Sequence, residues 1–85
     1  MKKLSVITVT YNAKHTLERT LKSVQEQTYP AIEHLIVDGN SNDGTVALIQ
    51  QYENERLKWI SEPDKGLYDA MNKGAKMATG DYLCF

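Results

Sequence analysis

The chain has 85 residues, of which 41% are hydrophobic and 25% charged, and its formal net charge is −1. This length suits one small domain, and the near-neutral charge excludes a protein that binds nucleic acid or membranes through its overall charge. The single cysteine, Cys84, excludes an internal disulfide and is typical of a reducing compartment. Because no apolar run approaches the length of a membrane span and no signal-peptide pattern follows the first residues, we expect a soluble, cytoplasmic chain.

Strand and helix patterns alternate along the chain. Runs that are rich in β-branched residues or bounded by turn residues predict strands at residues 4–10, 32–38, 57–61 and 81–85. Apolar residues at helical spacing predict three helices between them, with stripes formed by Leu17, Leu21 and Val24, by Val46, Ile49 and Tyr52, and by Leu67, Ala70, Met71, Gly74, Ala75 and Ala78. Asp43 is expected to be the N-cap of the second helix, and Pro63 predicts a loop before the third.

The order βαβαβαβ predicts a Rossmann-like α/β fold in which right-handed crossovers join parallel strands. We expect the spatial strand order 3-2-1-4, with helices on both faces and the fourth strand least well held at an edge. Ligands of such sheets bind at the carboxyl ends of the strands, which here are residues 10–12, 38–40 and 62–64. The polar stretch 37–45 therefore predicts the rim of a ligand site, with a plain solvated turn as the alternative.

Polar and aromatic side chains at these strand ends suit a phosphorylated, hydroxyl-rich ligand such as a nucleotide. Tyr11 offers a ring that can stack on a base, and Asp38 offers a carboxylate that can accept from a ring N–H or a ribose hydroxyl. Lys65 can meet a phosphate, while Asp69 and Asn72 share one face of the third helix. The candidate binding residues are Tyr11, Asn12, Asp38, Asp64, Lys65, Asp69 and Asn72.

Each candidate also has an ordinary structural explanation. A ring at a strand end is more often half-buried than a stacking platform, and Asp69 and Asn72 can simply cap or solvate the start of their helix. Lys73 and Lys76 predict a solvated helix face, both histidines are expected to be structural, and Cys84 is expected to be an inert buried thiol. The sequence lacks the G-x-G-x-x-G pattern, the P-loop pattern and zinc-ligand spacing, which argues against those three kinds of site.

Three stretches, in this order, resemble a known family. The segments LSVITVTYN at 4–12, IVDGNSNDGT at 36–45 and SEPDKGLYDAMNKGAKMATGDYLCF at 61–85 are similar to the corresponding parts of family 2 glycosyltransferases, which have the GT-A fold. They match the first strand, the turn after the second strand, and the third loop, helix and fourth strand. The form with VDG and EPDKGLYDAMNKG resembles bacterial enzymes that build surface and capsular polysaccharides.

The resemblance implies an enzyme that transfers a sugar from a nucleotide-sugar donor, expected to be a UDP-sugar, to a saccharide or lipid-linked saccharide, with inversion of the anomeric carbon. In the family, the residue matched by Tyr11 packs on the base, the acidic turn at Asp38 reads base and ribose, and the helix with Asp69 and Asn72 lies near the base and diphosphate. In the family, an Asp-X-Asp motif after the fourth strand holds Mn²⁺ or Mg²⁺, and a carboxylate from the second half of the domain acts as the base. Attachment of the parent to the cytoplasmic face of the membrane is left open.

Two departures from the family pattern affect these expectations. Where many members have a second acid, this chain has Gly39, so either Asp38 takes the base-reading role or the main chain does. The chain stops at Phe85, where the Asp-X-Asp motif is expected, so residues 1–85 are expected to be the nucleotide-sugar-binding half alone, with neither metal ligands nor catalytic residues. We expect no sugar transfer by these residues alone, weak or absent binding of UDP, and self-association through an uncovered sheet edge and helix face.

A non-catalytic α/β module that binds a nucleotide or acts in signalling is the alternative. A signalling receiver needs an acidic pair after its first strand, where this chain has Thr10-Tyr11-Asn12. The strand-end residues therefore favour the glycosyltransferase, and no nucleic-acid partner is expected.

Overall fold

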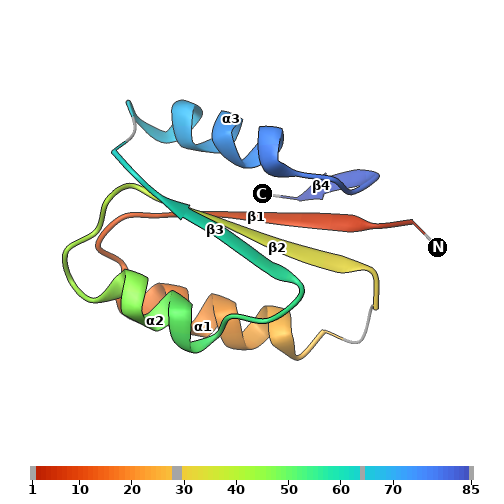
Figure 1. Ribbon diagram of the computed structural model, residues 1–85, viewed down its shortest axis with the longest axis horizontal. Helices are drawn as coiled ribbons and strands as arrows, with labels where there is room; N and C mark the ends of the chain where they lie inside the picture. Colours follow the sequence, from red (N-terminus) through yellow and green to blue (C-terminus); the bar gives the residue numbers. More distant parts are fainter. Residues whose placement is uncertain (1, 28–29, 64, 85) are drawn as a thin grey trace.

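Within residues 2–27, 30–63 and 65–84, which the computed structural model describes, strands and helices alternate along the chain (Figure 1). The elements are β1 (Leu4–Thr10), α1 (Lys14–Gln25), β2 (Ile32–Asp38), α2 (Thr45–Gln51), β3 (Leu57–Ser61), α3 (Leu67–Met77) and β4 (Tyr82–Cys84). The expected alternation is confirmed, and β1, β2 and β3 have the bounds that the sequence predicts. None of the described helices has the length and apolar character needed to cross a membrane.

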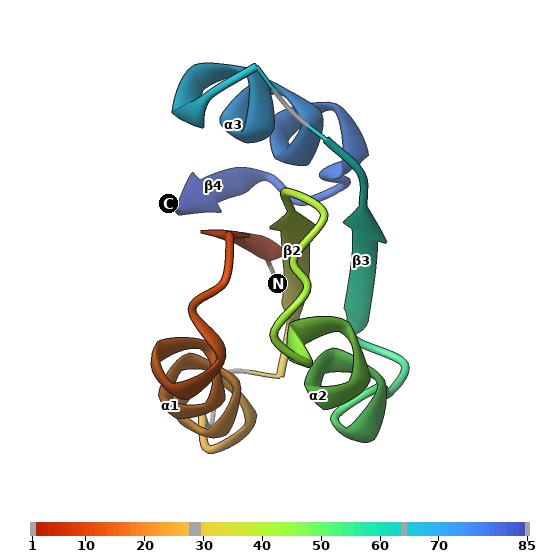
Figure 2. The same cartoon turned by 90° about the vertical axis from the view of Figure 1, so that its left-hand side faces the viewer.

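The four strands form one parallel sheet in the order β3-β2-β1-β4. β1 pairs with β2 over its whole length, from Leu4 opposite Ile32 to Thr10 opposite Asp38. Figures 1 and 2 show α1 and α2 on one face of the sheet and α3 on the other. The predicted strand order and the helices on both faces are confirmed. Because the strand order reverses at β1, a ligand crevice is expected at the carboxyl ends of the strands.

β4 lies at the edge of the sheet, as expected. Its described residues pair only with the first half of β1, from Tyr82 opposite Leu4 to Cys84 opposite Val6. Tyr82 and Leu83 are exposed, and so is Cys84, which contradicts the expectation of a buried thiol. The thiol is exposed because no described element covers β4 on its outer side.

Packed cores lie on both faces of the sheet. Between the sheet and the pair α1–α2, the buried residues are Leu17, Leu21, Ile36, Leu48 and Ile49, with Tyr52, Leu57 and Trp59 packed against them. On the other face α3 lies close to the sheet at Gly74, where an added Cβ would overlap Cγ2 of Ile7 and lie 3.4 Å from Cγ2 of Val37. Each fully buried Leu or Ile contributes ~1.5–3 kcal/mol, so these two layers fix the strands that carry the ligand edge.

A buried carboxylate fixes the turn between α3 and β4. Oε1 of Glu33 accepts hydrogen bonds from Oγ of Ser5 at 2.7 Å and from the amide of Thr79 at 2.6 Å, and Oε2 accepts from Oγ1 of Thr79 at 2.9 Å. Nζ of Lys3 lies 3.2 Å from Oε2. Burial raises the pKa of Glu33, but hydrogen bonds from Thr79, Ser5 and Lys3 outweigh it and lower the pKa from 4.5 to about 2. This network lies at the amino ends of the strands, away from the candidate site.

Candidate functional site

The end of β1 carries an exposed ring on a backbone that is held in place. Tyr11 is 62% exposed. The next residue, Asn12, has a φ of +47°, a left-handed conformation that asparagine tolerates better than most residues. Its amide donates to Oγ of Ser41 at 2.8 Å, and its Oδ1 accepts from the amide of Asn42 at 2.9 Å. These hydrogen bonds connect the segment after β1 to the loop after β2. Figure 2 views the sheet from its carboxyl edge, where β1, β2 and β3 end.

Asp38, the last residue of β2, is fully buried and points into the protein. Its Oδ1 accepts from Oγ of Ser41 at 2.5 Å, and its Oδ2 accepts from the amide of Ser41 at 2.8 Å and from Oγ of Ser61 at 2.7 Å. Ser61 ends β3, so one carboxylate joins the ends of two strands and the loop between β2 and α2. In this arrangement its hydrogen bonds go to the protein, and direct contact with a ligand stays a prediction.

Asp43 is not the N-cap of α2, so that expectation is wrong. Gly44 occupies the N-cap position with a φ of +91°, which moves the start of the helix one residue along the chain. Asp43 instead accepts from Oγ1 of Thr45, from the amide of Thr45 at 3.1 Å and from the amide of Lys14 at 3.3 Å. The hydrogen bond from Oγ1 of Thr45 is the main cause that lowers the pKa of Asp43. Asp43 therefore joins the starts of α1 and α2.

The β3–α3 loop is held by an ion-pair network. Oδ2 of Asp69 accepts from the amide of Lys65 at 3.0 Å and lies 3.4 Å from Nζ of Lys73. Nζ of Lys73 also lies 3.0 Å from Oε1 of Glu62 and donates to the carbonyl oxygen of Pro63 at 3.0 Å. The amide of Lys65 lowers the pKa of Asp69, and the hydrogen bond to Glu62 raises the pKa of Lys73. The expected solvated role of Lys73 is wrong, because its ammonium bridges the loop and the helix.

The structure places six of the seven candidate residues at the carboxyl edge. Tyr11 and Asn12 follow β1, Asp38 ends β2, and Lys65, Asp69 and Asn72 lie in the β3–α3 loop and the first two turns of α3. The seventh, Asp64, lies outside the described residues. Exposure differs among the six: Tyr11, Asn12, Lys65 and Asn72 are exposed, Asp69 is half-buried, and Asp38 is buried. The exposed members are the ones available to a ligand.

The sequence reasoning did not identify three residues that build this edge. Ser41 follows Asp38 by three residues, a spacing at which an aspartate side chain commonly accepts a hydrogen bond from a backbone amide of the turn that follows it. Lys73 follows Asp69 by four residues, which is the spacing of a helical ion pair. Ser61 gives no such signal, because its contact with Asp38 depends on strand register. One buried hydroxyl at this edge, Oγ1 of Thr10, has no hydrogen-bond partner among the described residues.

Comparison with known proteins identifies the family. The sequence profile of glycosyl transferase family 2 matches residues 5–85. The chain is 48% identical over 83 residues to the uncharacterized glycosyltransferase Rv1514c of Mycobacterium tuberculosis. This match covers 96% of this chain and 32% of that protein. It is 35% identical over 83 residues to the UDP-Glc:α-D-GlcNAc-diphosphoundecaprenol β-1,3-glucosyltransferase WfgD of Escherichia coli. This match covers 96% of this chain and 33% of that protein. The chain belongs to glycosyl transferase family 2.

A solved structure supports the same assignment. The mannosyltransferase PcManGT from Pyrobaculum calidifontis, in complex with GDP-Man and Mn²⁺, matches with a TM-score of 0.89 and 30% sequence identity, over 96% of this chain and 26% of that chain. The expected GT-A type of fold and the expected family are confirmed. This chain spans about a third of the length of the curated relatives that it matches.

Proposed function

We propose that the whole protein transfers a sugar from a nucleotide-sugar donor, with UDP as the expected nucleotide, to a saccharide or a lipid-linked saccharide. The product is part of a bacterial surface polysaccharide, and the reaction takes place in the cytoplasm or at the cytoplasmic face of the membrane. Family membership supports sugar transfer. The name of WfgD specifies a UDP-glucose donor and an acceptor linked to diphosphoundecaprenol, which supports the donor and acceptor classes.

The observation that carries the proposal is the exposed ring of Tyr11 at the reversal of strand order. The ring is 62% exposed, and a ring at the carboxyl edge of a parallel sheet suits stacking on a base. Lys65 and Asn72 are exposed farther along the same edge and suit phosphate and hydroxyl groups. The nucleotide-sugar in the PcManGT complex supports this ligand class.

In the proposed reaction, an acceptor hydroxyl forms a bond to the anomeric carbon while the bond from that carbon to the nucleoside diphosphate breaks. Attack opposite the leaving group inverts the carbon, and the hydroxyl proton passes to a carboxylate base. None of the described residues is assigned to this base. The part that we assign to this chain is to bind and orient the nucleotide.

Mn²⁺ or Mg²⁺ is the proposed cofactor of the whole protein, and the Mn²⁺ of the PcManGT complex supports it. The described residues do not fit as the site of that ion, because no group of three or more His, Cys, Asp or Glu side chains among them could hold one. The carboxylates of Asp38, Asp43 and Asp69 each accept hydrogen bonds from separate protein groups. We therefore derive no step of the reaction through a metal.

An NMR titration of the 85-residue chain with UDP and Mg²⁺ tests the proposal. We expect weak binding, with amide signals that shift in residues 10–12, 39–42 and 65–72 and stay unchanged in residues 54–58 at the opposite edge. Tyr11→Ala should weaken binding by at least about fivefold, since stacking on a base contributes ~1–3 kcal/mol. Tyr82→Ala is the matched control, because Tyr82 is 58% exposed on β4 near the opposite edge. No shift at millimolar UDP, or shifts confined to the opposite edge, contradicts the proposal.

A further inference from the structure

The ends of β2 and β3 meet at one buried carboxylate, and hydrogen bonds extend from it to the backbone that follows the exposed ring of Tyr11. The Asp38 carboxylate accepts hydrogen bonds from the amide and the hydroxyl of Ser41 and from the hydroxyl of Ser61. Oγ of Ser41 in turn accepts the amide of Asn12. A continuous series of hydrogen bonds thus runs from Asp38 through Ser41 to Asn12, which directly follows Tyr11 in the chain.

The ring of Tyr11 is exposed, and the residues on both sides of it are anchored through hydrogen bonds. On one side Thr10 is held in the sheet, and its carbonyl oxygen accepts the amide of Gly39 at 2.9 Å. On the other side Asn12 is held by Ser41 and Asn42. An exposed ring between two fixed residues has a fixed backbone but little side-chain support. Its direction therefore depends on both anchors.

We infer that Asp38 is a positioning residue: acting through Ser41, it fixes Asn12 and so orients the ring of Tyr11 toward the ligand, without contacting the ligand itself. The ligand part of this inference rests on the proposed function. A side chain that is already oriented before binding loses less freedom when the ligand binds, so loss of the series should weaken nucleotide binding by about two- to tenfold. The next residue, Gly39, has no side chain, so the end of β2 offers no second carboxylate that could contact the ligand directly.

Two other acids near this edge, Asp43 and Asp69, act in the same way. Asp43 accepts from the amide of Lys14 and from Thr45, which joins α1 to α2. Asp69 accepts from the amide of Lys65 and lies beside Lys73, which joins the β3–α3 loop to the helix. Each carboxylate fixes the segment next to an exposed side chain. This shared use favours positioning over ligand contact for Asp38 as well.

Ser41→Ala and Ser61→Ala form a matched pair for the test. Both remove a hydroxyl that donates to Asp38, but only Ser41→Ala breaks the connection to Asn12. We expect Ser41→Ala to abolish the hydrogen-exchange protection of the Asn12 amide, while the amides of β1 and β2 stay protected. Ser61→Ala should leave the Asn12 amide protected, and Ser41→Thr, which keeps the hydroxyl, should restore protection. An Asn12 amide that stays protected in Ser41→Ala overturns the inference.

Nucleotide binding by the same variants separates positioning from contact. In titrations with UDP, Ser41→Ala should weaken binding by at least about twofold, and Ser61→Ala should not. Asp38→Asn should lower both Asn12 protection and affinity, and the double variant with Ser41→Ala should lose no more affinity than the worse single variant. Affinity that falls in Asp38→Asn with Asn12 still protected, or losses that add in the double variant, shows a direct contact and overturns the inference. If the unmodified chain binds no UDP, the proposed function fails, while the exchange experiment still decides whether Asp38 acts through Ser41.

Discussion

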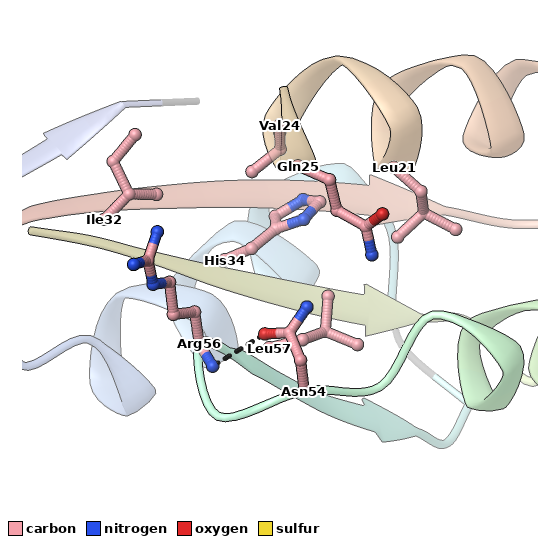
Figure 3. Close-up of a pocket in the computed structure, with 8 residues that line it drawn as sticks. All are labelled: Leu21, Val24, Gln25, Ile32, His34, Asn54, Arg56 and Leu57. Carbon is pink, nitrogen blue, oxygen red and sulfur yellow. Dashed lines mark hydrogen bonds between the residues drawn. The ribbon is translucent and has the colours of Figure 1, made fainter. Parts of the chain in front are cut away.

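Mild acid should destabilise the fold through His34. This side chain is 3% exposed in β2, and its Nε2 lies 2.7 Å from Oγ1 of Thr8. His34 lines a cavity of about 40 Å³ together with Leu21 and Val24 of α1 and with Leu57. Figure 3 shows the side chains that line this cavity. Burial lowers the pKa of His34 from 6.5 to about 4, so the folded chain keeps the imidazole neutral.

The sign and size of the effect follow from this shift in pKa. Because the pKa is lower in the folded chain, the unfolded chain binds more protons, and stability is fully present above pH 6.5 and lost as the pH falls toward 4. At about 1.4 kcal/mol per pKa unit, the limit is about 3 kcal/mol, of which about 2 kcal/mol is lost by about pH 5. Glu33 contributes little in this window, because its pKa changes from 4.5 to about 2 and its stabilisation is lost only below pH 4.5.

Urea denaturation followed by the fluorescence of Trp59, which packs against the core, measures the free energy of unfolding. We expect the unmodified chain to lose about 2 kcal/mol between about pH 7.5 and about pH 5. The variant His34→Gln does not titrate, so its free energy of unfolding should stay nearly constant over the same range. Parallel losses in the two proteins would refute the assignment of the effect to His34.

Three further predictions concern packing, buried polar groups and the sheet edge. Gly74→Ala should lower the free energy of unfolding by ~1–3 kcal/mol in urea titrations, because the added Cβ overlaps Cγ2 of Ile7, and an unchanged midpoint would contradict this close packing. Thr10→Val should raise stability by about 1 kcal/mol, since it removes a buried hydroxyl without a described partner, whereas Thr45→Val should lower stability because it removes a donor to Asp43. Effects of the same sign in the two threonine variants would contradict that account. The exposed edge at β4 should make the chain self-associate, and Leu83→Lys should reduce the fraction of dimer measured by analytical ultracentrifugation. An unmodified chain that sediments as a monomer would contradict this prediction.

Much of the fold follows from local pattern. The first three strands have the predicted bounds because β-branched residues fill them and turn residues follow them. The strand order 3-2-1-4 follows from alternation and crossover handedness. The predicted N-cap of α2 was one residue too early, because Asp43 is a residue type that commonly caps helices. The left-handed Gly44 instead takes that place and frees Asp43 to bond with Lys14 across the loop.

The positions of the candidate residues on the sheet could be predicted from the sequence, but the directions of their side chains could not. Topology places Tyr11, Asp38 and Lys65 at one edge, as expected. The Asp38 carboxylate also accepts a hydrogen bond from Ser61, which is 23 residues away and meets it only through strand register. Such a contact leaves no local pattern in a single sequence. The ion pair of Lys73 with Asp69 had a readable spacing, but its bond to Glu62 depends on how the loop folds back.

Buried carboxylates occur at both ends of the sheet, and a comparison between them separates stability from function. Glu33 collects hydrogen bonds at the amino end, where the neighbouring backbone enters β4 and continues the sheet. Asp38 collects hydrogen bonds at the carboxyl end, where the backbone that it fixes carries the exposed ring of Tyr11. Folding alone explains the first network, because it orders a strand. The second orders a loop beside a solvent-facing aromatic residue, which supports the proposal that this edge binds a nucleotide.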